Sequence, residues 1–260
     1  MAVRSVRSLS GLVRPRHGAP AGERRRGPTT KSRLLTTTEA GFRLMSRLRR
    51  APALHPQGLT CTADLEILAD PGEPWNAAWL DTPRRYTATV RLSRAAGLPR
   101  RLPDGLGLAI RVEQADGFDR ILDLLLTSSG PGRLTRHLPL PRADALAGPY
   151  SSLLSYRVGG RTRLLAAFPR RSGRAPVSGD PASLRKALAA APLVFDLCAE
   201  TSDRTWRAFG VLTVRTPLPR GQEDGIAFDI YGHSAPGLTP GGTLAATRRA
   251  AYRGSRAGRR

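Results

Sequence analysis

The sequence predicts a single antiparallel β-barrel domain of the α+β class, with helices near the two ends of the chain. Several runs of residues alternate strictly between apolar and polar side chains, which is typical of strands with one buried face. These strands follow one another in a long series, while the helical patterns flank it. The chain has 260 residues, which suits one large barrel, and antiparallel closure removes exposed strand edges.

The first half of the chain is predicted to form one helix and four strands. The helix begins at the capping box Thr36-x-x-Glu39 and ends before Pro52. In the next segment Cys61 and three apolar residues alternate with polar ones, so that one face of this strand is buried. The four predicted strands cover residues 61–67, 86–92, 106–112 and 121–127, of which the last is the most uniformly apolar.

In the second half, Asp180-Pro181 predicts the start of a helix over Ala182–Ala190, because proline is favoured at the first helical position. Two strands are expected to pair through the turn Thr201–Thr205. The other predicted elements are a short helix over 142–155, strands over 162–168, 193–200 and 206–215, an irregular Pro/Gly-rich segment over 216–243, and a C-terminal helix over 244–258.

The charge of the chain is strongly positive, at +22, with 42 basic and 20 acidic residues. Residues 1–50 carry thirteen of the basic residues and two of the acidic ones, so this end holds about half of the net charge. Such a charge attracts anions. A nucleic-acid-binding protein is one alternative, but the aromatic residues that stack on bases are not interleaved with the arginines. We expect residues 1–35 to be a disordered Arg-rich tail.

The two cysteines and the hydropathy of the chain favour a cytoplasmic location. Cys61 and Cys198 form no metal-binding motif and are expected to be buried thiols, as suits a reducing compartment. No stretch approaches 18 consecutive apolar residues, so we expect no membrane span.

The C-terminal helix carries the most informative pattern. Arg248, Tyr252, Ser255 and Arg259 share one stripe of a helix, which suits an anionic partner. A guanidinium one turn from a phenol stabilises the phenolate, and tyrosinate is a known proximal haem ligand. The other interpretation is a solvated basic tail with one half-buried tyrosine. His55, just before the first strand, is a lone histidine, and such residues are more often structural than catalytic.

Three separated blocks resemble the haem core of the catalase family, and they occur in the family's order. The block around His55, LHPQG, is similar to VHAKG at the family's distal histidine. TVRLS over residues 89–93 and DGLGLAIR over residues 104–111 are similar to VRFS and DxRGFAxK. The C-terminal stripe is similar to the family's proximal helix. The resemblance covers roughly residues 50–260. The chain resembles the small catalase-related haem proteins of the actinobacterial type, some of which are labelled phosphodiesterases.

The resemblance implies a catalase-like haem-binding domain over residues 36–260, with haem b as the cofactor and a hydroperoxide or hydrogen peroxide as the substrate. Tyr252 would be the iron ligand and Arg248 would keep it ionised. Arg91 and Arg259 would pair with the propionates. The implied catalytic residues are His55 as the distal acid–base group, Ser93 as its hydrogen-bond partner, and Thr127.

The chain departs from the family pattern at two positions. Thr127 stands where the family has its distal asparagine, and Pro52 stands where it has an arginine, for which Arg50 is a candidate substitute. These departures favour weak peroxidase or organic-hydroperoxide chemistry over efficient dismutation. They also leave open a catalase-fold protein that binds another ligand. A hydrolase such as a phosphodiesterase would need a two-metal cluster of His and Asp, and the sequence shows only scattered single residues. The oligomeric state is left open as well.

Overall fold

A computed structural model describes residues 57–70, 72–98, 102–115, 117, 120–171, 173, 175–219, 221–222 and 226–241. Several sequence predictions lie outside these residues. They are the tail over 1–35, the helix that begins at Thr36, the C-terminal helix, and the four site residues His55, Arg248, Tyr252 and Arg259.

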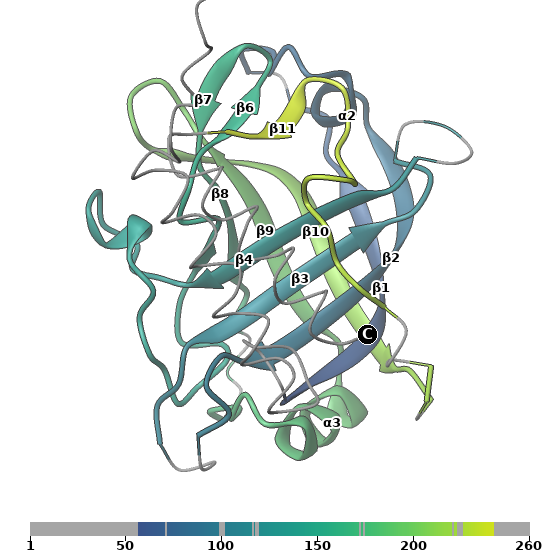
Figure 1. Ribbon diagram of the computed structural model, residues 1–260, viewed down its shortest axis with the longest axis vertical. Coiled ribbons are helices and arrows are strands. Elements are labelled where there is room, and N and C mark those ends of the chain that lie inside the picture. The colour runs from purple at the N-terminus through teal and green to yellow at the C-terminus, as the bar shows by residue number, and fades with distance from the viewer. Residues whose placement is uncertain are drawn as a thin grey trace, which may run out of the picture.

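The chain folds into a closed barrel of eight antiparallel strands, as the sequence predicts (Figure 1). Around the barrel the order is β1-β10-β9-β8-β5-β4-β3-β2, so β1 pairs with both β2 and β10 and closes the sheet. The strands are β1 (Gln57–Ile67), β2 (Arg84–Arg94), β3 (Leu106–Val112), β4 (Leu122–Ser128), β5 (Tyr150–Ser151), β8 (Leu165–Pro169), β9 (Leu193–Glu200) and β10 (Trp206–Pro217).

The barrel interior is filled by the apolar residues that alternate along each strand. In β1 the inward side chains run from Leu59 through Cys61 to Ile67, and each is at most 2% exposed. Burying a side chain of the size of Leu or Ile stabilises the fold by about 1.5–3 kcal/mol. Because successive side chains point to opposite faces, the residues between them form the outer face of the barrel. This alternation confirms the predicted burial of Cys61, and Cys198 is buried as well.

The two ends of the barrel are closed by different elements (Figure 1). At one end α3 (Pro181–Ala190) begins at Asp180, whose side chain accepts hydrogen bonds from two backbone amides of the first turn, and Leu184 and Leu188 join the core. At the other end lie the short helix α2 (Ala78–Asp81) and a three-stranded sheet of β6 (Tyr156–Val158), β7 (Arg161–Arg163) and β11 (Leu238–Pro240). Gly159, at the β6–β7 turn, has a φ of 54°, and a Cβ there would overlap the carbonyl oxygen of Trp75, so only glycine is accommodated.

The predicted helix over residues 142–155 is wrong. In this segment Arg142 instead forms an isolated antiparallel β-bridge with Asp104, and Tyr150–Ser151 form the two-residue strand β5. Gly148-Pro149 disfavours a continuous helix, and Tyr150 is drawn into the barrel, where its hydroxyl donates to the carbonyl of Ala145. The predicted strand over 162–168 is divided between β7 and β8, and η1 (Thr135–His137), α2, β6 and β11 were not predicted. Among the described helices, none is long and apolar enough to cross a membrane.

Candidate functional site

Two of the predicted catalytic residues lie in one row across the outer face of the barrel. Ser93 in β2 is paired with Gly58 on one side and with Gly107 on the other, and Gly107 is paired with Thr127 in β4. Neighbouring strands are about 4.8 Å apart, so Ser93 and Thr127 are separated by roughly 10 Å across β3. Ser93 is buried and Thr127 is half-buried.

Arg91, the predicted propionate partner, lies in the next row of the same face. It is paired with Thr60 in β1 and with Ala109 in β3. Its Nη1 donates to Thr60 Oγ1 over 3.2 Å, and the guanidinium passes over Gly58. A Cβ at Gly58 would come within 2.9 Å of Arg91 Cζ and 2.8 Å of the carbonyl oxygen of Leu92. The Arg91 guanidinium therefore lies directly against the backbone of Gly58, where there is no room for a side chain.

This outer face is lined by small and hydroxylated residues. Thr60, Ser93 and Ala109 point away from the barrel interior and are nevertheless at most 9% exposed. Glycine, alanine and small hydroxyl groups leave little side-chain bulk on this face, and a guanidinium beside it suits a carboxylate. Among the described residues of this face, Arg91 thus offers a positive charge that suits a carboxylate.

Arg91, Ser93 and Thr127 lie on the same outer face of the barrel, and their roles, like those of the other site residues, stay predictions. His55 precedes β1 by two positions in the sequence, and Tyr252 follows the last described residue by eleven. Within the described ranges no group of three or more His, Cys, Asp and Glu residues is close enough to hold a metal ion.

A second polar cluster lies on β3 and β4, two residues beyond the row of Arg91 and Ala109, and no pattern in the sequence indicates it. Arg111 in β3 forms a bidentate ion pair with Asp123 in β4, with Nε–Oδ1 and Nη2–Oδ2 distances of 2.8 and 2.7 Å. His233, from the Pro/Gly-rich segment, lies with Nδ1 2.8 Å from Asp123 Oδ2. The hydrogen bond with Asp123 raises the pKa of the Arg111 guanidinium.

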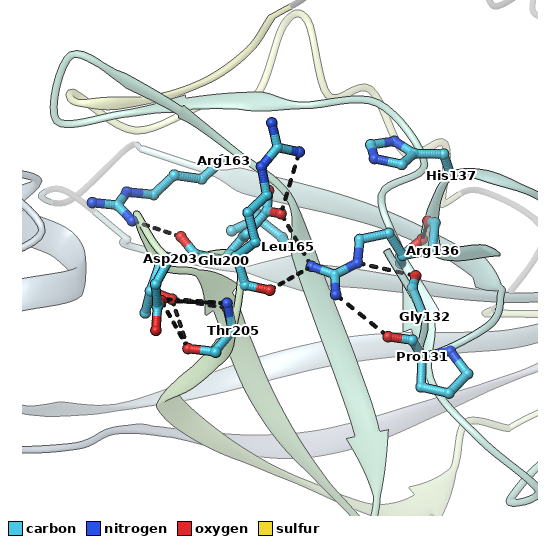
Figure 2. Close-up of polar contacts among 12 residues, drawn as sticks. Pro131, Gly132, Arg136, His137, Arg163, Leu165, Glu200, Asp203 and Thr205 are labelled. Carbon is cyan, nitrogen blue, oxygen red and sulfur yellow. Dashed lines mark hydrogen bonds and ion pairs between the residues drawn. The ribbon is translucent and has the colours of Figure 1, made fainter. Parts of the chain in front are cut away.

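A third cluster, at the barrel end that carries α2, is a buried ion network (Figure 2). Arg136 donates to the Glu200 carboxylate over 3.0 Å, and Arg163 donates to the backbone carbonyl of Glu200 over 2.6 Å. All three guanidinium nitrogens of Arg136 donate to protein oxygens, and the group stacks on Trp206 with 4.7 Å to the ring centre. Burial lowers the pKa of Arg163. Because the donors of Arg136 are used within the protein, we assign this network to the stability of the barrel end.

Comparison with known proteins connects this geometry to one fold. No family model matches the sequence, and no curated protein matches it significantly. Among solved structures, the chain is similar to a bacterial catalase with a TM-score of 0.54 and 15% identity, over 96% of this chain and 67% of that one. It is similar to a fungal catalase with a TM-score of 0.53 and 15% identity, over 90% of this chain and 64% of that one.

The chain therefore has a catalase-like fold, built on a closed eight-stranded antiparallel barrel. This confirms the fold class that the sequence predicts. The matched region spans about two thirds of the length of either catalase.

Proposed function

We propose that this protein is a haem-dependent, catalase-related enzyme that acts on organic hydroperoxides or hydrogen peroxide. The observation that carries the proposal is the placement of Arg91 over Gly58, on the same buried outer face as Ser93, in a barrel of catalase-like fold. The haem would lie against this face, with a propionate paired with Arg91.

Three further residues complete the proposed haem site. Tyr252 would ligate the iron, and Arg248, one helical turn earlier, would stabilise its phenolate. Arg259 would hold the second propionate. When bound, the haem would supply the redox-active iron at which the peroxide reacts.

The distal side would be served by His55, Ser93 and Thr127. His55 would receive a proton from one peroxide oxygen and deliver it to the other. The Ser93 hydroxyl would form a hydrogen bond with the imidazole of His55, as donor or as acceptor, and so fix the tautomer of the imidazole. Thr127, two strands from Ser93's own strand, would donate to the bound peroxide. A hydroxyl presents its hydrogen bond with a geometry that differs from that of an amide, and we propose that this difference favours hydroperoxide turnover over rapid dismutation. We also propose that the protein acts in the cytoplasm.

The proposal is tested by loading the protein with haem during expression and measuring turnover of hydrogen peroxide and cumene hydroperoxide with guaiacol as the electron donor. We expect His55→Ala to keep its Soret band and lose about 10²–10⁴-fold in turnover. The matched control is His137→Ala, because His137 is exposed and bonds only a backbone carbonyl among its described contacts. A haem-loaded wild type that turns over neither peroxide would refute the enzymatic proposal and favour a ligand binder. Metal-dependent phosphodiester cleavage that persists in Tyr252→Phe would favour the hydrolase.

A further inference from the structure

The carboxylate of Asp123 holds a distant part of the chain against the barrel. Its Oδ2 receives three donors, Arg111 Nη2 at 2.7 Å, the backbone amide of Asp229 at 2.6 Å and His233 Nδ1 at 2.8 Å. Asp123 is fully buried although it lies on the outer face of β4. A buried carboxylate is stable only when its oxygens are bonded to donors. The hydrogen-bond donors of Asp229 and His233 therefore stabilise Asp123, and Asp123 in turn fixes the position of residues 229–233.

Barrel residues also donate hydrogen bonds to backbone carbonyls of residues 226–241. Arg111 Nη2 donates to the carbonyl of Ala227 over 2.8 Å, and its guanidinium carbon lies 5.2 Å from the ring centre of Phe228. The backbone amide of Asp123 donates to the carbonyl of His233 over 3.1 Å. Figure 1 shows residues 226–241 crossing the outer face of the front strands toward β11.

The segment also folds on itself between these anchors. The backbone amide of His233 donates to the carbonyl of Asp229, and Asp229 Oδ1 receives the amides of Tyr231 and Gly232. This compact loop places the imidazole of His233 over β4. Nδ1 lies 2.8 Å from the acceptor Asp123 Oδ2 and 3.2 Å from Arg111 Nη2. Because Arg111 Nη2 already donates to Asp123 and to Ala227, the tautomer that suits the site carries its proton on Nδ1.

The cluster lies beside the proposed haem face and shares its strands. Arg111 follows Ala109 by two positions in β3, and Asp123 precedes Leu125 by two in β4, so both belong to the same outer face as Arg91 and Ser93. Two residues along a strand span about 6.8 Å. A few residues after His233, β11 pairs with β6 through Leu238 and gives the segment a second point of attachment.

We propose that Arg111, Asp123 and His233 form a latch that positions residues 226–241 on the barrel beside the proposed haem face, and that this position is needed to retain the haem. The part of this inference that concerns haem rests on the proposed function. The three residues are positioning residues, because they act through the segment and not on the substrate. The latch spans 110 residues between Asp123 and His233, so it couples the middle of the chain to the segment that precedes Tyr252.

The test compares Asp123→Asn with Asp196→Asn. Asp196, in β9, is the control because it also forms a bidentate pair, with Arg170 directly after β8, and none of its described partners comes from residues 226–241. Hydrogen exchange of the haem-free proteins is read by mass spectrometry on peptides from 226–241. We expect these peptides to exchange at least tenfold faster in Asp123→Asn and unchanged in Asp196→Asn. Equal exchange in the wild type and Asp123→Asn would overturn the latch, whether or not the protein binds haem.

A second measurement tests positioning at the haem. In the haem-loaded proteins we expect haem transfer to apomyoglobin to be at least tenfold faster in Asp123→Asn, with a ferric spectrum shifted toward that of Tyr252→Phe, and unchanged in Asp196→Asn. His233→Ala removes one of the three donors and is expected to show a smaller effect of the same sign, so it replaces Asp123→Asn if that variant does not fold. Faster exchange with an unaltered spectrum and haem transfer would overturn the positioning role. A colourless wild type would refute the proposed function alone, and the exchange result would still decide whether the latch exists.

Discussion

Gly58→Ala is the change that probes the proposed haem face most locally. The added Cβ would lie 2.8 Å from the carbonyl oxygen of Leu92 and 2.9 Å from Arg91 Cζ. The guanidinium can swing away, but the carbonyl belongs to β2, which is paired with β1 along eleven residues. The two strands must therefore separate locally. Overpacking of this kind costs about 1–3 kcal/mol.

The assay is urea unfolding, followed by haem titration of the folded variant. We expect a loss of about 2 kcal/mol in the free energy of unfolding, which lowers Tm by about 4–8 °C in a chain of this size. We also expect weaker haem binding, because the Arg91 guanidinium can no longer lie against the backbone of residue 58. Gly241→Ala is the control, since a Cβ there meets nothing closer than 3.4 Å. An unfolding free energy for Gly58→Ala equal to that of the wild type would refute the close packing on which the site rests.

Three further predictions concern stability and reactivity. Asp180→Ala removes the cap of α3 and is expected to cost about 1 kcal/mol in urea unfolding; no change would show that the helix needs no cap. Glu200→Ala leaves the Arg136 guanidinium buried without its counter-charge and is expected to lower the free energy of unfolding by about 3–5 kcal/mol. Glu66→Ala, which removes an exposed ion pair, is expected to lower it by less than about 1 kcal/mol. Equal losses in the two variants would contradict the buried network. Burial raises the pKa of Cys198 to about 12, so the thiol stays protonated in the folded protein while it ionises above about pH 9 after unfolding. Stability should therefore fall between pH 9 and 12, less steeply in Cys198→Ala, and iodoacetamide should not label Cys198 at pH 8 before unfolding.

The strands of the first half of the barrel were predictable because the burial of one strand face produces a regular pattern in the sequence. A strand with one face in the barrel interior must alternate, and the runs around Cys61, Val90 and Leu108 do so. The same alternation places Arg91 and Ser93 on the outer face. The start of α3 was predictable because Asp180-Pro181 is a local signal.

The parts that were missed depend on contacts between residues far apart in the chain. β5 has two residues, and it is a strand only because Ser151 pairs with Thr127 on one side and with Ala166 on the other. No local pattern records such pairing, and apolar residues in this segment resemble a helix face. The contact of His233 with Asp123 was not predictable either, because nothing near His233 in the sequence indicates Asp123 as its partner.

The most direct test of the central claim is the visible spectrum of protein expressed with a haem precursor, compared with Tyr252→Phe. Tyr86→Phe is the control, because Tyr86 lies among the core residues inside the barrel. We predict a Soret band with ferric high-spin features in the wild type and in Tyr86→Phe, lost or shifted in Tyr252→Phe. A wild-type protein that is colourless and takes up no added haemin would contradict the account and leave a catalase-like barrel that serves another ligand.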